Sequence, residues 1–267
     1  MADVDPADLL DLAVRSARAA GRLLLAGVER TLAFATKSTP TDVVTEMDTA
    51  AERLIRERIR AERPKDGLLG EEGGEAAAGL DTEVRWIIDP IDGTVNYLYR
   101  IPQWAVSIAA EVAGEVIVGV VYDPSKDELY TAVRGEGAWL NGTPIRVRPC
   151  AELGQALVGT GFGYAAARRA RQAEILTGVL PVVRDIRRLG SAALDLCAVA
   201  CGRFDAYFER GLNLWDFAAA GLVATEAGAR VGGLNGAPPS SRLVVAATPG
   251  VFDALHDVLA SLGADHD

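Results

Sequence analysis

The sequence contains little histidine, and this scarcity limits the chemistry available to it. Among its 267 residues the histidines are His256 and His266, both close to the C-terminal end of the sequence. A histidine-ligated zinc site and a Ser-His-Asp triad each need imidazoles placed beside the reacting groups. We therefore expect neither, and any catalysis by this chain has to depend on carboxylates.

Cysteine is also scarce. Cys150, Cys197 and Cys201 are its three cysteines, and no two of them have the Cys-x-x-Cys spacing. Cys197 and Cys201 lie one helical turn apart in an apolar run, so we expect them to be core residues. A low cysteine content fits a reducing compartment, and we expect the protein in the cytoplasm.

An excess of basic residues and long apolar runs are missing as well. Lys and Arg number 27 against 37 Asp and Glu, which gives a formal net charge of −10. This balance excludes the basic footprint typical of direct nucleic-acid binding. No uninterrupted apolar run reaches about 18 residues, so we expect no membrane span. Asp3, Asp5 and Asp8 occupy the place of a basic leader segment, and we expect no signal peptide.

Residues 84–94, with the sequence VRWIIDPIDGT, are the most informative stretch. The apolar, β-prone side chains at its start favour a buried strand, and Pro90, which lacks an N–H, is expected to end it. Asp89 and Asp92 stand three residues apart at that end. Two such carboxylates repel each other unless a cation neutralises them, and Mg²⁺ prefers oxygen ligands of this kind.

Gly93 and Thr94 follow directly. A glycine lets the backbone approach a ligand closely, and amides that open a short helix at Thr94 suit a phosphate. An isolated Asp-Pro or Asp-Gly pair is more often an ordinary turn than a metal site. Two other carboxylates change this interpretation, because Glu71 follows the short apolar segment 68–70 and Asp216 begins an apolar helix. Together they favour a site assembled from distant segments.

Three motifs in this sequence resemble the signature motifs of the inositol monophosphatase family. They are GEE at residues 70–72, DPIDGT at residues 89–94 and WDFAAAG at residues 215–221. Their order and spacing match, and the resemblance runs from about Lys37 to Gly228. Members of this family are Mg²⁺-dependent, lithium-sensitive phosphomonoesterases that are commonly homodimers, so the resemblance implies these properties here.

The resemblance implies one inositol monophosphatase-like domain over residues 1–267, built as the layered αβαβα sandwich of the sugar phosphatases. Its N-terminal half (about 1–148) is α+β and its C-terminal half (about 149–267) is α/β. Periodicity agrees, because helices are predicted at 7–28 and 48–62. A surface loop is predicted at 73–81, and antiparallel strands are predicted at 105–112, 116–122, 128–133 and 145–147. Strands and helices then alternate at 156–160, 166–178, 182–185, 191–200, 204–209, 216–227, 243–247 and 249–262.

The resemblance also implies a set of metal ligands. Glu71 and Asp89 hold a first Mg²⁺ together with the backbone carbonyl of Ile91. Asp89 bridges to a second Mg²⁺, whose ligands are completed by Asp92 and Asp216. Two such ions stabilise the phosphoryl oxygens, activate a water and assist the leaving oxygen.

Further roles follow from the same resemblance. The hydroxyl of Thr94 and the carboxylate of Asp48 orient and deprotonate the attacking water, and Glu71 assists through a third, weakly held metal. The backbone amides of Gly93 and Thr94 bind the phosphate. Lys37 matches a family lysine near the site. Taken alone, Asp48 is more typical of an acid that starts a helix, and the catalytic role is favoured only within the whole set of residues.

The substrate contacts are implied by a separate segment. Gly190, Ser191 and Ala192 match positions that lie near the sugar-like ring in the family, and Glu209 matches its hydroxyl-binding glutamate. A carboxylate at that place accepts hydrogen bonds from a polyol. The function implied first is hydrolysis of inositol 1-phosphate to inositol and phosphate. Fructose-1,6-bisphosphate or another small sugar phosphate is the alternative substrate, and a regulatory scaffold in a transcription complex is the alternative of a different class.

Overall fold

A computed structural model describes residues 4–28, 34–36, 43–76 and 84–266. Both helices predicted near the N-terminus are present, as α1 at Pro6–Gly27 and α2 at Glu46–Glu62. Lys37 lies outside the described residues, and so do residues 77–81 of the predicted loop. The role of Lys37 therefore stays a prediction.

The largest sheet has eight strands in the order β10-β9-β8-β7-β6-β5-β3-β4. All neighbours are antiparallel except β3 and β5, which are parallel. The bounds are β3 (Gly67–Gly70), β4 (Gly74–Ala76), β5 (Val84–Asp92), β6 (Ala105–Val112), β7 (Glu115–Asp123), β8 (Glu128–Val133), β9 (Gly137–Leu140) and β10 (Thr143–Pro144).

A second sheet has five strands in the order β12-β11-β13-β15-β14. Strand β11 runs parallel to both of its neighbours, whereas β15 is antiparallel to β13 and β14. The bounds are β11 (Leu157–Thr160), β12 (Asp185–Arg187), β13 (Ala206–Glu209), β14 (Arg230–Gly232) and β15 (Val244–Ala247). A short antiparallel pair, β1 (Phe34–Thr36) and β2 (Val43–Thr45), precedes α2.

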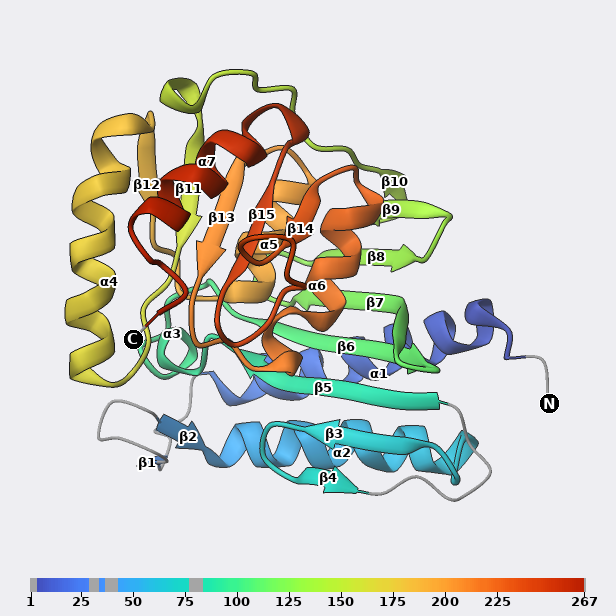
Figure 1. The fold of residues 1–267 in the computed structure, drawn as a ribbon. Coiled ribbons are helices and arrows are strands. Elements are labelled where there is room, and N and C mark those ends of the chain that lie inside the picture. Colours follow the sequence, from blue (N-terminus) through green and yellow to red (C-terminus); the bar gives the residue numbers. More distant parts are fainter. Residues whose placement is uncertain (1–3, 29–33, 37–42, 77–83, 267) are drawn as a thin grey trace.

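Helices and sheets alternate as the αβαβα sandwich that was predicted (Figure 1). Helices α1 and α2 cover one face of the large sheet, and α5 and α6 lie between the two sheets. Helices α4 and α7 pack on the outer face of the five-stranded sheet. The remaining helix, α3, follows β5. The bounds are α3 (Thr94–Leu98), α4 (Ala166–Val179), α5 (Ala192–Ala200), α6 (Leu214–Glu226) and α7 (Pro249–Ser261).

Strand β5 is buried on both faces, which explains its nearly continuous apolar run. Trp86 and Ile88 face the core beneath α1 and α2, while Ile87 faces the core shared with α5 and α6. The C-terminal end of β5 thus emerges between the helical layers, where residues from several elements converge. Within the described ranges, no helix is both long enough and apolar enough to cross a membrane.

The prediction that Pro90 ends the strand was wrong. Strand β5 continues to Asp92, with Asp89 opposite Ser107 and Asp92 opposite Ala105 on β6. Pro90 and Ile91 of β5 therefore oppose the single residue Val106 of β6, which is the register of a β-bulge. Pro90 is tolerated because it lies within the bulge, where the ladder requires no N–H from it.

Two other predicted strands were wrong in position. The strand predicted at 145–147 is absent. A hairpin of β9 and β10, which flank the two-residue turn of Asn141 and Gly142, lies just before that position. Both turn residues have positive φ angles, 50° and 76°, as a two-residue hairpin turn requires. The strand predicted at 182–185 begins at Asp185, because Pro181 lies in a short 3-10 helix. Part of the predicted loop at 73–81 is strand β4, paired with β3.

Candidate active site

Three buried or half-buried carboxylates meet at the end of β5. Asp89 and Asp92 come from β5 and Asp216 from α6, and each offers an oxygen atom within 4.8 Å of the others. Burial and the neighbouring negative charges hold the pKa of Asp89 and of Asp216 well above their usual range. A set of oxygen donors under mutual repulsion fits a hard divalent cation, and these are the residues that would hold it.

The bulge in β5 brings two of these carboxylates together. Residues three apart on a regular strand point to opposite faces of the sheet. The extra residue between Asp89 and Asp92 cancels this alternation, so both side chains reach one site. The N–H of Ile91 donates to Asp89 Oδ1 at 3.0 Å, which fixes that carboxylate inside the bulge.

Asp216 is placed by the start of α6. Its Oδ2 accepts the backbone N–H of Asn213 at 2.6 Å, in a capping box that closes the first turn of the helix. Trp215 is partly buried against the core between the sheets. Because α6 packs on β5 and β6, its first turn lies beside the two aspartates of β5.

Glu71 approaches the cluster through the parallel pairing of β3 with β5. Gly70 lies opposite Ile88, and the N–H of Glu71 donates to the Ile88 carbonyl at 3.3 Å. After burial, the charge of Glu71 is the largest cause of the raised pKa of Asp89. Glu71 is not among the three carboxylates that share the 4.8 Å group, so it stands at the edge of the cluster.

Asp48 and Thr94 are in contact, as predicted from the resemblance. Thr94 Oγ1 lies 3.0 Å from Asp48 Oδ1 and 3.0 Å from the carbonyl oxygen of Ile91. A hydroxyl has one proton to donate, so donation to Asp48 leaves the Ile91 carbonyl available to a metal. Asp48 also closes a capping box with Thr45, which confirms it as an acid that starts a helix, while its catalytic role stays a prediction. Burial raises the pKa of Asp48 to about 6.

The segment before α5 anchors Asp92. The hydroxyl of Ser191 donates to Asp92 Oδ2 at 2.5 Å, and the N–H groups of Ala193 and Ala192 donate at 2.7 and 3.3 Å. Burial raises the pKa of Asp92 to about 6 against these hydrogen bonds. The predicted contacts of Gly190, Ser191 and Ala192 with a substrate stay predictions.

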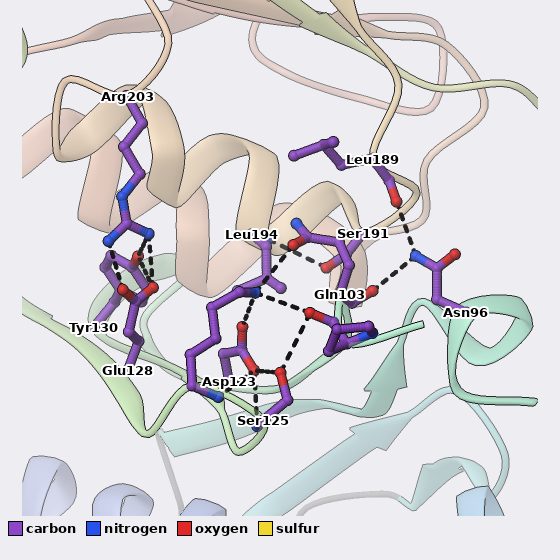
Figure 2. Close-up of polar contacts among 12 residues, drawn as sticks. Asn96, Gln103, Asp123, Ser125, Glu128, Tyr130, Leu189, Ser191, Leu194 and Arg203 are labelled. Atoms are coloured by element: carbon purple, nitrogen blue, oxygen red, sulfur yellow. Dashed lines mark hydrogen bonds and ion pairs between the residues drawn. The ribbon is translucent and has the colours of Figure 1, made fainter. Parts of the chain in front are cut away.

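The same segment is held to the end of β5 by Asn96. Its Nδ2 donates to the carbonyl of Gln103 at 2.7 Å and to that of Leu189 at 2.8 Å (Figure 2). Gly93 lies beside this junction with a φ of 99°, and a side chain there would meet the Gln103 carbonyl at 3.0 Å. Sequence reasoning missed Asn96, since a polar residue two positions after a motif carries no distinct signal.

Glu209 ends β13 and faces the same region. The hydroxyl of Tyr207 donates to its Oε2 at 2.5 Å, and burial raises the pKa of Glu209 to about 7. Its charge contributes to the raised pKa of Asp216, and the charge of Asp92 contributes to the raised pKa of Glu209. The guanidinium of Arg188 acts in the opposite direction and lowers the pKa of Glu209. Glu209 is thus close enough to the cluster to take part in one site, and its contact with a polyol stays a prediction.

The fold and the site define a layered αβαβα protein with a carboxylate centre suited to a hard cation. The sequence profile described as "Inositol monophosphatase family" matches residues 5–263. The chain belongs to the inositol monophosphatase family, a family of phosphatases.

Some relatives are named inositol-1-monophosphatase and others are named Nus factor. "Inositol-1-monophosphatase SuhB" of Mycobacterium tuberculosis is 50% identical over 229 residues, which cover 82% of this chain and 78% of the relative. "Nus factor SuhB" of Escherichia coli K12 is 44% identical over 230 residues, covering 85% of this chain and 86% of the relative. A crystal structure of the suhB extragenic suppressor protein of Bartonella henselae superposes with a TM-score of 0.89, 36% identity and coverage of 94% and 98%.

Proposed function

We propose that the protein hydrolyses the phosphate monoester of a small polyol, with inositol 1-phosphate as the first substrate and Mg²⁺ as the cofactor. The observation that carries the proposal is the group formed by Asp89, Asp92 and Asp216, whose oxygens lie within 4.8 Å of one another. Family membership supports the reaction class. The electrostatic coupling of Glu209 to Asp92 and Asp216 supports a substrate with hydroxyls to donate near this group.

The protein's own residues supply binding and proton transfer. When bound, Mg²⁺ supplies positive charge to the phosphoryl oxygens and lowers the pKa of a water. Asp89, Asp92 and Asp216 provide the oxygen ligands, with Glu71 at the edge. The attacking water gives one proton to Thr94 Oγ1 while the Thr94 hydroxyl gives its own proton to Asp48 Oδ1, so that Thr94 remains a neutral hydroxyl and Asp48 holds the proton. A pKa of about 6 suits Asp48 to act as a base near neutral pH.

Phosphate release from inositol 1-phosphate tests this function. Turnover should require Mg²⁺, fall with added Li⁺, and drop by about 100-fold or more in Asp92→Asn, which keeps the shape but removes a ligand charge. Fructose-1,6-bisphosphate, histidinol phosphate and adenosine 3′,5′-bisphosphate complete the panel. Release from another ester only would move the substrate assignment, and release from none by a folded, Mg²⁺-binding protein would reject the function.

A regulatory role is the second candidate, because the Escherichia coli relative is named a Nus factor. A protein acting only as a scaffold has no need of a carboxylate cluster, so this role would be additional to hydrolysis. A partner that co-purifies equally with wild type and Asp92→Asn supports it. Loss of the partner in Asp92→Asn would instead tie binding to the metal site.

We also propose a homodimer that acts in the cytoplasm. Tyr99, Ile101 and Leu189 are exposed by 72%, 47% and 36%, and the proposal places these apolar side chains at a contact between subunits. The three cysteines are free, as suits a reducing compartment. Light scattering coupled to size exclusion decides the oligomeric state, and a monomer at micromolar concentration would contradict the dimer.

A further inference from the structure

A buried charged pair on α2 lies beneath the turn that carries Glu71. The side chain of Glu52 is 3% exposed and that of Arg56 is 11% exposed, and Arg56 Nε donates to Glu52 Oε1 at 2.6 Å. Neither residue has a part in the reaction described above. Burying an ion pair costs desolvation energy that its own attraction often fails to offset, so the retention of such a pair calls for an explanation.

The pair forms hydrogen bonds with both N–H and carbonyl groups of the turn's backbone. Glu52 Oε2 accepts the N–H of Glu72 at 2.7 Å, and Oε1 accepts the N–H of Gly73 at 2.8 Å. Arg56 Nη2 donates to the carbonyl of Gly74 at 2.6 Å. The carboxylate and the guanidinium together therefore fix the turn from residue 72 to residue 74, immediately after Glu71.

The fit between Glu52 and this turn is tight. A Cβ atom added at Gly70 would lie 2.4 Å from Glu52 Oε1, and one added at Gly73 would lie 2.7 Å from it. Real Cβ atoms essentially never approach another atom so closely. Glycine on both sides of Glu71 thus allows the carboxylate to reach the backbone.

We propose that Glu52, supported by Arg56, is a positioning residue that holds the carboxylate of Glu71 toward Asp89. The inference deepens the proposed function and rests on it, because Glu71 matters there as a ligand. Helix α2 also carries Asp48 one turn earlier, in contact with Thr94. One rigid helix that packs on β5 therefore sets both Asp48 and the Glu71 turn relative to the cluster.

Mn²⁺ binding to Glu52→Gln tests the proposal directly. The variant keeps the shape but turns an amide N–H₂ toward a backbone N–H and removes the negative charge beside Arg56. We expect Mn²⁺ affinity to fall by about 10- to 100-fold, as for other residues that orient metal ligands. We also expect lower kcat with a nearly unchanged KM, and faster amide exchange at residues 71–74 in the metal-free protein.

Glu57→Gln is the matched control, because Glu57 lies on the same helix, is 68% exposed and pairs with Arg53 at 3.9 Å. It should match the wild type in every measurement. If Glu52→Gln fails to fold, Arg56→Lys decides, since it keeps the charge beside Glu52 and loses the fork that reaches Gly74. Faster exchange at 71–74 with weaker Mn²⁺ binding supports the proposal.

Two outcomes would overturn the positioning role: wild-type Mn²⁺ affinity in the folded variant, or weakened affinity with wild-type exchange at 71–74. Asp89→Asn, measured in parallel, separates this from the proposed function. Loss of Mn²⁺ binding in Asp89→Asn with full binding in Glu52→Gln rejects the positioning role alone. Full binding in Asp89→Asn rejects the metal site, and the positioning role with it.

Discussion

Ser191 takes part in the start of a helix and in the candidate metal site. Its Oγ accepts the N–H of Leu194 as the N-cap of α5 and donates to Asp92. We expect Ser191→Ala to weaken Mg²⁺ binding by about 10-fold or more, because Asp92 loses a hydrogen bond that orients it. The lost cap should also lower stability by about 1 kcal/mol.

Ser191→Thr is the control for this prediction, since threonine keeps the hydroxyl. Mg²⁺ titrations of turnover and thermal melts of the two variants make the comparison. Equal Mg²⁺ requirements in Ser191→Ala and the wild type would show that the hydroxyl does not orient the ligand.

A substitution at Thr94 separates metal binding from the catalytic step. Thr94→Val replaces the hydroxyl by a methyl group of similar size and breaks the contact with Asp48. We expect kcat to fall by about 10²- to 10⁴-fold, the range typical of lost general acid–base catalysis, while Mn²⁺ affinity stays close to that of the wild type. Steady-state kinetics and calorimetry measure the two quantities. A parallel loss of both would assign Thr94 to metal binding.

The raised pKa values predict how metal binding depends on pH. Burial places the pKa of Asp48 and of Asp92 at about 6 in the metal-free protein. A divalent cation binds the ionised form, so it displaces protons below that pH. Affinity for Mn²⁺ should rise from pH 5 to pH 7, by up to about tenfold per pH unit for each proton released. Affinity independent of pH over this range would contradict the prediction.

Sequence reasoning located some site residues and missed others, for a physical reason. Asp89, Asp92 and Asp216 could be predicted because metal binding fixes the residue type and motifs surround them. Glu52 and Asn96 act by hydrogen bonds to backbone groups that are distant in sequence. Such contacts exist only once the chain has folded, so no local sequence pattern predicts them.

At the scale of elements, β5 shows where periodicity stops being informative. The apolar run predicted the strand, but alternation alone places Asp89 and Asp92 on opposite faces. The bulge that places both side chains on one side of the sheet depends on pairing with β6, which the sequence of β5 does not specify. Short strands such as β4 and β14 were missed for a related reason, because three residues give too few alternations to form a pattern.

The junction between α3 and the segment before α5 yields a prediction at this scale. Asn96→Asp keeps the shape of the side chain but replaces the donor that bridges the Gln103 and Leu189 carbonyls. Leaving a buried polar group unsatisfied costs about 1–3 kcal/mol. We expect faster amide exchange at residues 189–193 and a raised KM.

Asn96→Ala removes the bridge without adding a negative charge, so it separates the two causes. It should show the faster exchange with a smaller change in KM. If both variants exchange as slowly as the wild type, the two segments are held together by other contacts.

For the whole molecule, the layers could be predicted because alternating strands and helices restrict the architecture. The order of strands could not, since strand pairing is a long-range property. The sandwich brings β5 and α6 together, with the result that repelling carboxylates are buried at their junction. The carboxylate site should therefore lower the stability of the metal-free protein.

Asp89→Asn tests this consequence, because asparagine is similar in size and removes one of the repelling charges. In EDTA at pH 7 the variant should melt above the wild type, by about 2–4 °C for each kcal/mol of repulsion relieved. Saturating Mg²⁺ should stabilise the wild type, by about 2.7 kcal/mol at 100-fold Kd, and leave the variant nearly unchanged. Glu57→Gln, exposed on α2, should follow the wild type in both conditions.

The pH dependence of the same melts shows whether ionisation of the carboxylates lowers the stability of the metal-free protein. A folded pKa above the ordinary value of 3.8, such as about 6 for Asp92, means that the folded state binds more protons than the unfolded state between those two pH values. Stability of the metal-free wild type should thus fall as the pH rises through this window. The advantage of Asp89→Asn should shrink as the pH is lowered from 7 to 5, because protonation removes the same repulsion in the wild type. An Asp89→Asn protein less stable than the wild type in EDTA at pH 7 would show that hydrogen bonds to Asp89 outweigh the repulsion.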